Sequence, residues 1–200
     1  FKEAWLNADN HQQAGARVID WLETRDDVDM DKIGVMGMSM GSRWGVQLGA
    51  HDKRVKAVVG QMANVGTFDM IFEQAQPNFK RIFMYMTGYT DEVEFDEHMK
   101  SHDHLPDVAK KVIVPHLLVA GDMDELCTPD DIAHFRENLG GSSELWLYEG
   151  IFHPMGEVSA EIYPAMADWM LTTLNEGRPD GERKMVYIDE GTTLAEHDHG

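Results

Sequence analysis

Hydrophobic residues gather along the chain in short, nearly continuous runs, and longer stretches with helical spacing separate these runs. Runs that are apolar at successive positions predict strands buried on both faces, and they lie at 32–36, 55–60, 116–120 and 144–149. Apolar residues three or four positions apart predict helices over 11–25, 42–52, 129–139 and 158–175. Strands that alternate with helices in this way are typical of an α/β fold, with a parallel sheet flanked by helices.

The connection between the second and third predicted strands, residues 61–111, is too long for a simple crossover. It is rich in aromatic residues and continues into an acidic segment, DEVEFDEHMK. We predict a short helical lid over the carboxyl edge of the sheet, and an ordinary surface excursion packed on the core is the alternative. The aromatic residues are Phe68, Phe72, Phe79, Phe83, Tyr85 and Tyr89.

The composition changes at Gly177, after which the chain is mostly polar. This change predicts one α/β domain over 1–176, with the insertion at 61–111 inside it, and a polar C-terminal tail over 177–200. Within the tail, 185–189 can add a short strand, and the acidic end at 196–200 is expected to fray.

The net charge and the cysteine content exclude some classes of binding partner but do not identify a substrate. The formal net charge is −19 over 200 residues, which argues against nucleic acid and against an anionic membrane as partners. No apolar run reaches membrane-spanning length. The single cysteine, Cys127, excludes an intrachain disulfide and fits a reducing, cytoplasmic location.

The segment KIGVMGMSMGSRWG places Ser39 between Gly37 and Gly41, after a predicted strand and before a predicted helix. In this setting the pattern G-x-S-x-G is typical of a nucleophile elbow. The tight turn lifts the Ser39 hydroxyl clear of the sheet and aims the amide of Met40 at the position of an oxyanion. We predict Ser39 as a nucleophile, and a purely structural glycine-flanked turn is the alternative.

A serine hydroxyl needs a base, and the base needs an orienting acid. The segment GDMDELCTP follows the third predicted strand and offers Asp122, Asp124 and Glu125. Asp124 is the preferred acid, because it stands far enough beyond the strand to curl back toward the serine. Alternatively these acids cap the next helix, a role that Asp130 fits better.

The segment GIFHPMG places His153 in a loop beyond the fourth predicted strand. Of the other histidines, His116 falls in a predicted strand, His134 in a predicted helix, and His197 and His199 in the tail. His153 therefore has the chain order and the setting of a general base, and an ordinary loop histidine is the alternative.

Together these segments resemble the α/β-hydrolase superfamily, and its prolyl-oligopeptidase-like, dienelactone-hydrolase-like branch in particular. The resemblance extends to about Leu174 and rests on VDMDKIGVMGMSMGS, VPHLLVAGDMDELCTP and LYEGIFHPMG, and MYMTGYTDEVEFDE resembles a short lid found in that branch. It implies a catalytic domain with a Ser-His-Asp triad that hydrolyses its substrate through an acyl-enzyme, without metal or organic cofactor.

The chain departs from that pattern before Lys32. The family's core has eight strands and the elbow follows the fifth, whereas 1–31 hold one clear helix. The loop that supplies the second oxyanion amide in the family is missing as well. We expect the sequence to be the C-terminal part of a longer hydrolase, and a short protein completed as a homo-oligomer is the alternative.

The favoured function is hydrolysis of a small or medium carboxylic ester. A peptidase acting on short peptides, a carbon–carbon bond hydrolase and a non-catalytic hydrolase-like binding protein are the alternatives. Met38, Met123 and Met155, with Met40, flank the predicted triad and either line a permissive acyl pocket or fill the core.

Other residues carry weaker signals. Arg43 could bind a substrate carboxylate, although an exposed helix arginine is the simpler expectation. Cys127 lies near the acid without an elbow around it, which argues against a nucleophile. A histidine-rich segment contains metal-ligand residue types, but it lacks a second ligand set and is expected to be solvated, with no metal site: His98, His102, Asp103 and His104.

Overall fold

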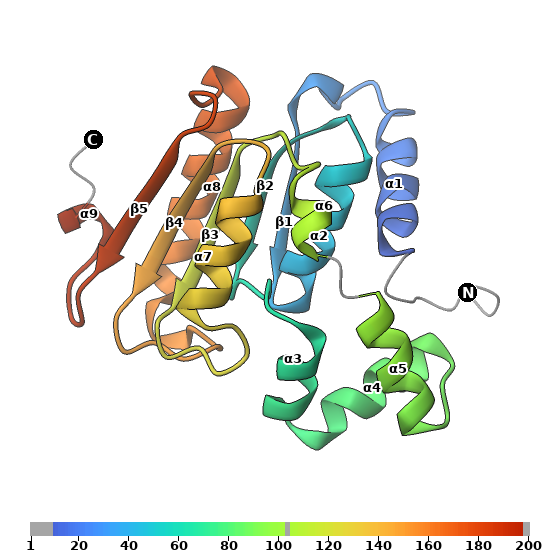
Figure 1. Ribbon diagram of the computed structural model, residues 1–200. Coiled ribbons are helices and arrows are strands. Elements are labelled where there is room, and N and C mark those ends of the chain that lie inside the picture. The colour runs from blue at the N-terminus through green and yellow to red at the C-terminus, as the bar shows by residue number, and fades with distance from the viewer. Residues whose placement is uncertain (1–9, 103–104, 198–200) are drawn as a thin grey trace.

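A single parallel sheet runs through the computed structural model, which describes residues 10–102 and 105–197 (Figure 1). Its five strands lie side by side in chain order, and every neighbouring pair is parallel. The strands are β1 (Ile33–Met38), β2 (Val55–Gln61), β3 (His116–Gly121), β4 (Ser143–Tyr148) and β5 (Arg183–Ile188). The four predicted strands are therefore confirmed to within one or two residues, and the α/β class with them.

Helices cover both faces of the sheet (Figure 1). One face carries α1 (His11–Leu22), α2 (Met40–His51), α6 (Leu105–Ala109) and α7 (Pro129–Asn138). The opposite face carries α8 (Ser159–Glu176). Two single turns of 3₁₀ helix, Met30–Lys32 and Gly156–Val158, precede β1 and α8.

The core has two layers because alternate residues of a strand point to opposite faces of the sheet. In β3, Leu118 and Ala120 pack toward α6 and α7, whereas Leu117 and Val119 pack toward α8. All of them are fully buried. This double burial explains why the central strands are apolar at successive positions.

The predicted insertion divides into two parts. Its first part is a three-helix unit beyond the carboxyl ends of the strands, made of α3 (Phe68–Gln74), α4 (Pro77–Thr87) and α5 (Glu92–Ser101) (Figure 1). Its last part, α6, instead packs into the core between α2 and α7. A lid function for α3–α5 remains a prediction.

Aromatic side chains hold the three-helix unit together. The ring of Phe72 lies 5.8 Å from that of Phe68, 5.5 Å from that of Phe83 and 5.2 Å from that of Phe95. The same cluster includes Met40 of α2, which joins the unit to the first turn of that helix. Tyr85, by contrast, is 79% exposed on the outside of α4.

The polar C-terminal tail was the wrong description of 177–200. Residues 183–188 form β5, which pairs with β4 along its whole length, and α9 (Leu194–His197) follows. Val186 and Ile188 are buried against α8, whereas Met185 and Tyr187, which alternate with them, are exposed. The short strand predicted at 185–189 is confirmed as part of β5. Residues 198–200 lie outside the described part of the chain.

A buried histidine in β3 makes stability depend on pH. His116 is fully buried beside the ring of Phe135, and neither ring nitrogen has a hydrogen-bond partner within the described residues. Burial lowers the pKa of His116 from 6.5 to about 3. Between those pH values the unfolded chain binds a proton that the folded chain does not, so the free energy of unfolding falls as pH drops.

We therefore expect His116→Leu to reduce the loss of stability between pH 6.5 and pH 4.5. Urea unfolding of wild type and variant at both pH values measures this, with His134→Leu at an exposed position of α7 as the control. An equal loss of stability in wild type and His116→Leu would show that His116 does not titrate as described.

Candidate active site

The strand–turn–helix element around Ser39 has the backbone of a nucleophile elbow. Ser39 lies between β1 and α2 with φ 52° and ψ −122°, in a region that costs a non-glycine residue about 1–3 kcal/mol. Its amide donates a hydrogen bond to the Gln61 carbonyl at 2.9 Å. The hydroxyl of Ser42 donates to the Ser39 carbonyl at 2.7 Å and accepts from the Asn64 amide at 2.8 Å. The turn is thus fixed from β2 and from the loop that follows it.

The two glycines of the motif have different roles. A Cβ atom on Gly37 would lie 2.0 Å from the backbone oxygen of Gly41, so the strand and the helix meet only because Gly37 has no side chain. A Cβ atom on Gly41 would have nothing within 4 Å. The close contact of strand and helix therefore requires a glycine at Gly37 and not at Gly41.

Three side chains from distant parts of the chain form one line of hydrogen bonds. Ser39 Oγ lies 2.7 Å from His153 Nε2. On the other side of the ring, His153 Nδ1 lies 2.8 Å and 3.0 Å from the two carboxylate oxygens of Asp124. The Asp124 side chain is fully buried and that of His153 is 11% exposed. This is the geometry of a Ser-His-Asp triad.

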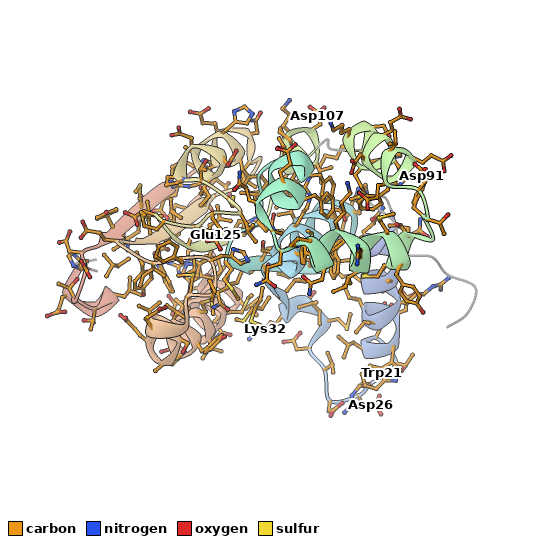
Figure 2. All side chains as sticks on the ribbon, turned by 90° about the horizontal axis from the view of Figure 1, so that it is seen from below. Trp21, Asp26, Lys32, Asp91, Asp107 and Glu125 are labelled. Atoms are coloured by element: carbon orange, nitrogen blue, oxygen red, sulfur yellow. The ribbon has the colours of Figure 1, made fainter. Side chains whose placement is uncertain are left out.

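The loop after β3 determines which acid reaches His153. Asp124 Oδ1 also accepts hydrogen bonds from the amides of Leu126 at 2.8 Å and Cys127 at 3.2 Å, so this carboxylate is held from both sides. Asp122 bonds elsewhere, to the Gly150 amide and the Tyr187 hydroxyl. Glu125 is exposed and is labelled near the centre of Figure 2, which looks onto the carboxyl ends of the strands. One of its carboxylate oxygens accepts a hydrogen bond from the His153 amide at 3.4 Å.

The next helix takes its cap from other residues than the sequence suggested. Thr128 is the N-cap of α7, its hydroxyl accepts from the Asp131 amide, and the Asp131 carboxylate accepts from the Thr128 amide. Neither Asp130 nor Asp124 therefore caps α7.

Met40 begins α2 directly after Ser39. The first amides of a helix have no partner within the helix, so an anion beside Ser39 can bind there. The Met40 side chain is buried in the aromatic cluster of α3–α5. The position of this amide is thus tied to the three-helix unit.

The methionines near the triad divide by exposure. Met38 and Met123, next to Ser39 and Asp124, are 51% and 52% exposed. Met155 is fully buried in the core against α8, so of the two alternatives it fills the core and does not line a substrate pocket. Phe152 directly precedes His153 and is 53% exposed, a residue that sequence reasoning missed. An apolar residue before each triad member was the available signal.

Arg43 is not an exposed arginine, and it does not reach toward a substrate. It is 1% exposed, donates a hydrogen bond to the Gly66 carbonyl and stacks 3.9 Å from the centre of the Phe68 ring. Arg43 thus anchors the start of the three-helix unit to α2.

Cys127 and the histidine-rich segment do not add chemistry to the site. Cys127 is buried, its Sγ accepts from the Val65 amide at 3.4 Å, and burial raises its pKa to about 12. Such a thiol stays protonated at neutral pH. The ring centres of His98 and His102 lie 4.4 Å apart with the planes tilted by 44°, whereas Asp103 and His104 lie outside the described residues. Within 10–102 and 105–197, no cluster of three metal-ligand side chains is present.

A separate cavity of about 370 Å³ lies between α8, β4 and β5. Trp146 and Trp169 form part of its wall, and both indole N–H groups donate to the Glu144 carboxylate at 2.8 Å. None of the three triad residues lines this cavity.

In the described part of the chain, no helix has the length and apolar character needed to cross a bilayer.

Comparison with solved structures identifies the same fold in proteins of low sequence identity. The 2,6-dihydroxy-pseudo-oxynicotine hydrolase is 19% identical with a TM-score of 0.79, and the match covers 92% of this chain and 52% of that one. An acetyl xylan esterase from Paenibacillus sp. R4 is 21% identical with a TM-score of 0.61, over 80% of this chain and 51% of that one. This chain therefore spans about half the length of either protein.

A third similar structure, the monoacylglycerol lipase of Paleococcus ferrophilus, is 14% identical with a TM-score of 0.60, over 86% of this chain and 77% of that one. No match was found among curated proteins. The family model of the prolyl oligopeptidase family matches residues 5–177, which is most of the sequence. The chain, an α/β-hydrolase in its fold, belongs to the prolyl oligopeptidase family.

Proposed function

We propose that the protein is a serine hydrolase that cleaves a carboxylic ester through an acyl-enzyme, with Ser39, His153 and Asp124 as its triad. The observation that carries this proposal is the continuous hydrogen-bond line from Ser39 Oγ through the imidazole to the buried carboxylate. A line of this kind serves a reaction in which a proton leaves the serine as its oxygen attacks.

In the proposed reaction His153 Nε2 takes the proton of Ser39 as the oxygen attacks the ester carbonyl. Asp124 holds the Nδ1 side of the ring and stabilises the imidazolium that forms. The amide of Met40 donates a hydrogen bond to the oxyanion. His153 then protonates the leaving alcohol and, in the second half, activates the water that releases the acid and restores Ser39.

The surroundings of the triad favour an apolar substrate. Met38, Met123 and Phe152 are each about half exposed, and each directly precedes a residue of the proposed triad in the chain. Exposed apolar side chains next to a reactive group are suited to hold a small or medium acyl or alcohol group. We include Met38 and Met123 among the substrate-binding residues, as the sequence suggested, and add Phe152.

A peptidase acting on short peptides is the second candidate, because the matching family is named for an oligopeptidase. A carbon–carbon bond hydrolase, which acts on an aromatic substrate, would need aromatic side chains that reach the substrate. Phe68, Phe83 and Phe95 are each at most 6% exposed and serve the packing of α3–α5. A non-catalytic binding protein would have no need of the assembled triad.

Two assays on the full-length gene product test the proposal. A fluorophosphonate probe should label Ser39, and absence of labelling in the folded protein would overturn every catalytic assignment. Hydrolysis rates for p-nitrophenyl esters and aminoacyl-p-nitroanilides then separate the two candidates. Turnover of esters alone supports the esterase, whereas turnover of anilides at comparable kcat/KM favours the peptidase.

A further inference from the structure

A residue that follows the segment matched by the family model, Tyr187, makes a hydrogen bond to the loop that carries Asp124. The match ends at 177, whereas β5 and its Tyr187 follow it. We infer that Asp122 and Tyr187 are positioning residues that clamp the loop carrying His153. The inference rests on the proposed serine-hydrolase reaction.

Asp122 connects three neighbouring strands at their carboxyl ends. Directly after β3, its amide donates to the Tyr148 carbonyl of β4 at 3.0 Å. Its Oδ1 accepts from the Gly150 amide at 2.8 Å, and its Oδ2 accepts from the Tyr187 hydroxyl of β5 at 2.9 Å. One carboxylate thus joins the acid loop, the histidine loop and the last strand.

The clamp acts on the segment that aims the catalytic ring. Gly150 stands three residues before His153, in a turn with φ 69°. Its neighbour Ile151 accepts from the Met123 amide at 3.1 Å, and a Cβ atom on Gly121 would lie 1.9 Å from the Ile151 oxygen. The two loops are therefore in close backbone contact, and a shift of Gly150 would move His153 relative to Ser39.

The chemistry of the pair suits a clamp. A phenol that donates to a carboxylate forms a charge-assisted hydrogen bond, which is stronger and more directional than a neutral one. That bond raises the pKa of Tyr187 to about 12, so its hydroxyl remains a donor throughout the range of an activity assay.

The effect of removing the Tyr187 hydroxyl can be measured separately from the effect of disrupting β5. Tyr187 is 39% exposed, while Val186 and Ile188 on either side are buried and attach β5 to the core. Tyr187→Phe therefore removes the contact with Asp122 and leaves the packing of β5 in place. Met185→Leu, at a 51% exposed position of the same strand, is the matched control.

Steady-state kinetics on a p-nitrophenyl ester, with the full-length gene product, provide the first test. We expect kcat to fall about tenfold in Asp122→Ala and about threefold in Tyr187→Phe, with KM changed by less than about twofold, because misplacement of the base affects the reaction step. Asp122→Asn keeps an acceptor for the Gly150 amide and should retain more activity than Asp122→Ala. The double variant Asp122→Ala/Tyr187→Phe should match Asp122→Ala.

Hydrogen exchange of the peptide that contains 149–153 provides a test without activity. Exchange should be faster in Asp122→Ala and Tyr187→Phe than in wild type and Met185→Leu. Unchanged exchange in both variants overturns the clamp, whether or not the fluorophosphonate labels Ser39. Faster exchange with wild-type kcat overturns the positioning role alone, and an unlabelled wild type overturns the proposed function.

Discussion

Replacement of Ser39 by alanine is expected to abolish fluorophosphonate labelling and to lower ester turnover by at least about 10⁴-fold. The reason is that, in the proposed mechanism, the Ser39 hydroxyl, 2.7 Å from His153 Nε2, forms the bond to the acyl group. Without it, the proposed oxyanion donor and substrate-binding side chains would still orient a substrate and leave a small residual rate over water. Labelling by mass spectrometry and steady-state kinetics measure the two effects.

The same variant should fold normally. Alanine at φ 52° carries about the same backbone strain as serine, so we expect a melting temperature within a few degrees of wild type. Ser101→Ala, in the last residue of α5, is the control and should keep full labelling and turnover. Labelling of a different serine in Ser39→Ala would show that the nucleophile lies elsewhere.

Replacement of Gly37 by alanine is expected to lower the free energy of unfolding by more than about 4 kcal/mol, and with it the yield of folded protein. The added Cβ would lie 2.0 Å from the Gly41 oxygen and 2.3 Å from its carbonyl carbon. Both atoms belong to the backbone at the start of α2, so no rotamer change can relieve the collision. The strand and the helix would have to separate at the elbow.

Gly41→Ala is the matched control for this effect. A Cβ at this position meets nothing within 4 Å, and the residue lies in the first turn of α2. Because alanine favours the helix over glycine, the free energy of unfolding should change by less than about 1 kcal/mol, in the direction of higher stability. Chemical unfolding of the two variants compares them directly, and equal destabilisation would contradict the role given to Gly37.

The sequence predicts the structure best where a local residue pattern depends directly on the position of that segment in the fold. The central strands are apolar at successive positions because both of their faces are covered, so their bounds can be found closely. Carboxyl ends of parallel strands meet at one edge of a sheet, and for this reason the chain order of Ser39, Asp124 and His153 was enough to predict that they come together.

The prediction failed where a partner arrives from far along the chain. Arg43 was expected to be a surface arginine, but it contacts the Gly66 carbonyl and the Phe68 ring, more than twenty residues away. Met155 follows His153 closely, but the backbone turns between them and places the methionine beneath α8. The distant contact has no signature in the local sequence, and Pro154 and Gly156 indicate a turn without showing where Met155 will point.

The C-terminal residues show a different limit. β5 lies at the edge of the sheet and holds one short apolar run, 185–188, between polar segments. That run was enough to predict a short strand at 185–189, but the polar residues around it concealed that the strand belongs to the domain. The insertion between β2 and β3 was recognised by its length and aromatic content, whereas the inward packing of α6 was not predicted.

The agreement between strand order and chain order bears on how the protein folds during synthesis. Because β1 to β5 lie side by side in sequence, each new strand can dock on a neighbour that has already left the ribosome, without waiting for a later segment. Such stepwise growth keeps most pairings between nearby parts of the chain and limits the exposure of apolar edges. Ser39, the proposed nucleophile, emerges long before His153, its proposed base, so a nascent chain can build much of the sheet before the hydrogen bond between them can form. Reactivity toward a fluorophosphonate would then report, in a stalled-ribosome series, the moment at which β4 and the histidine loop have closed onto the sheet.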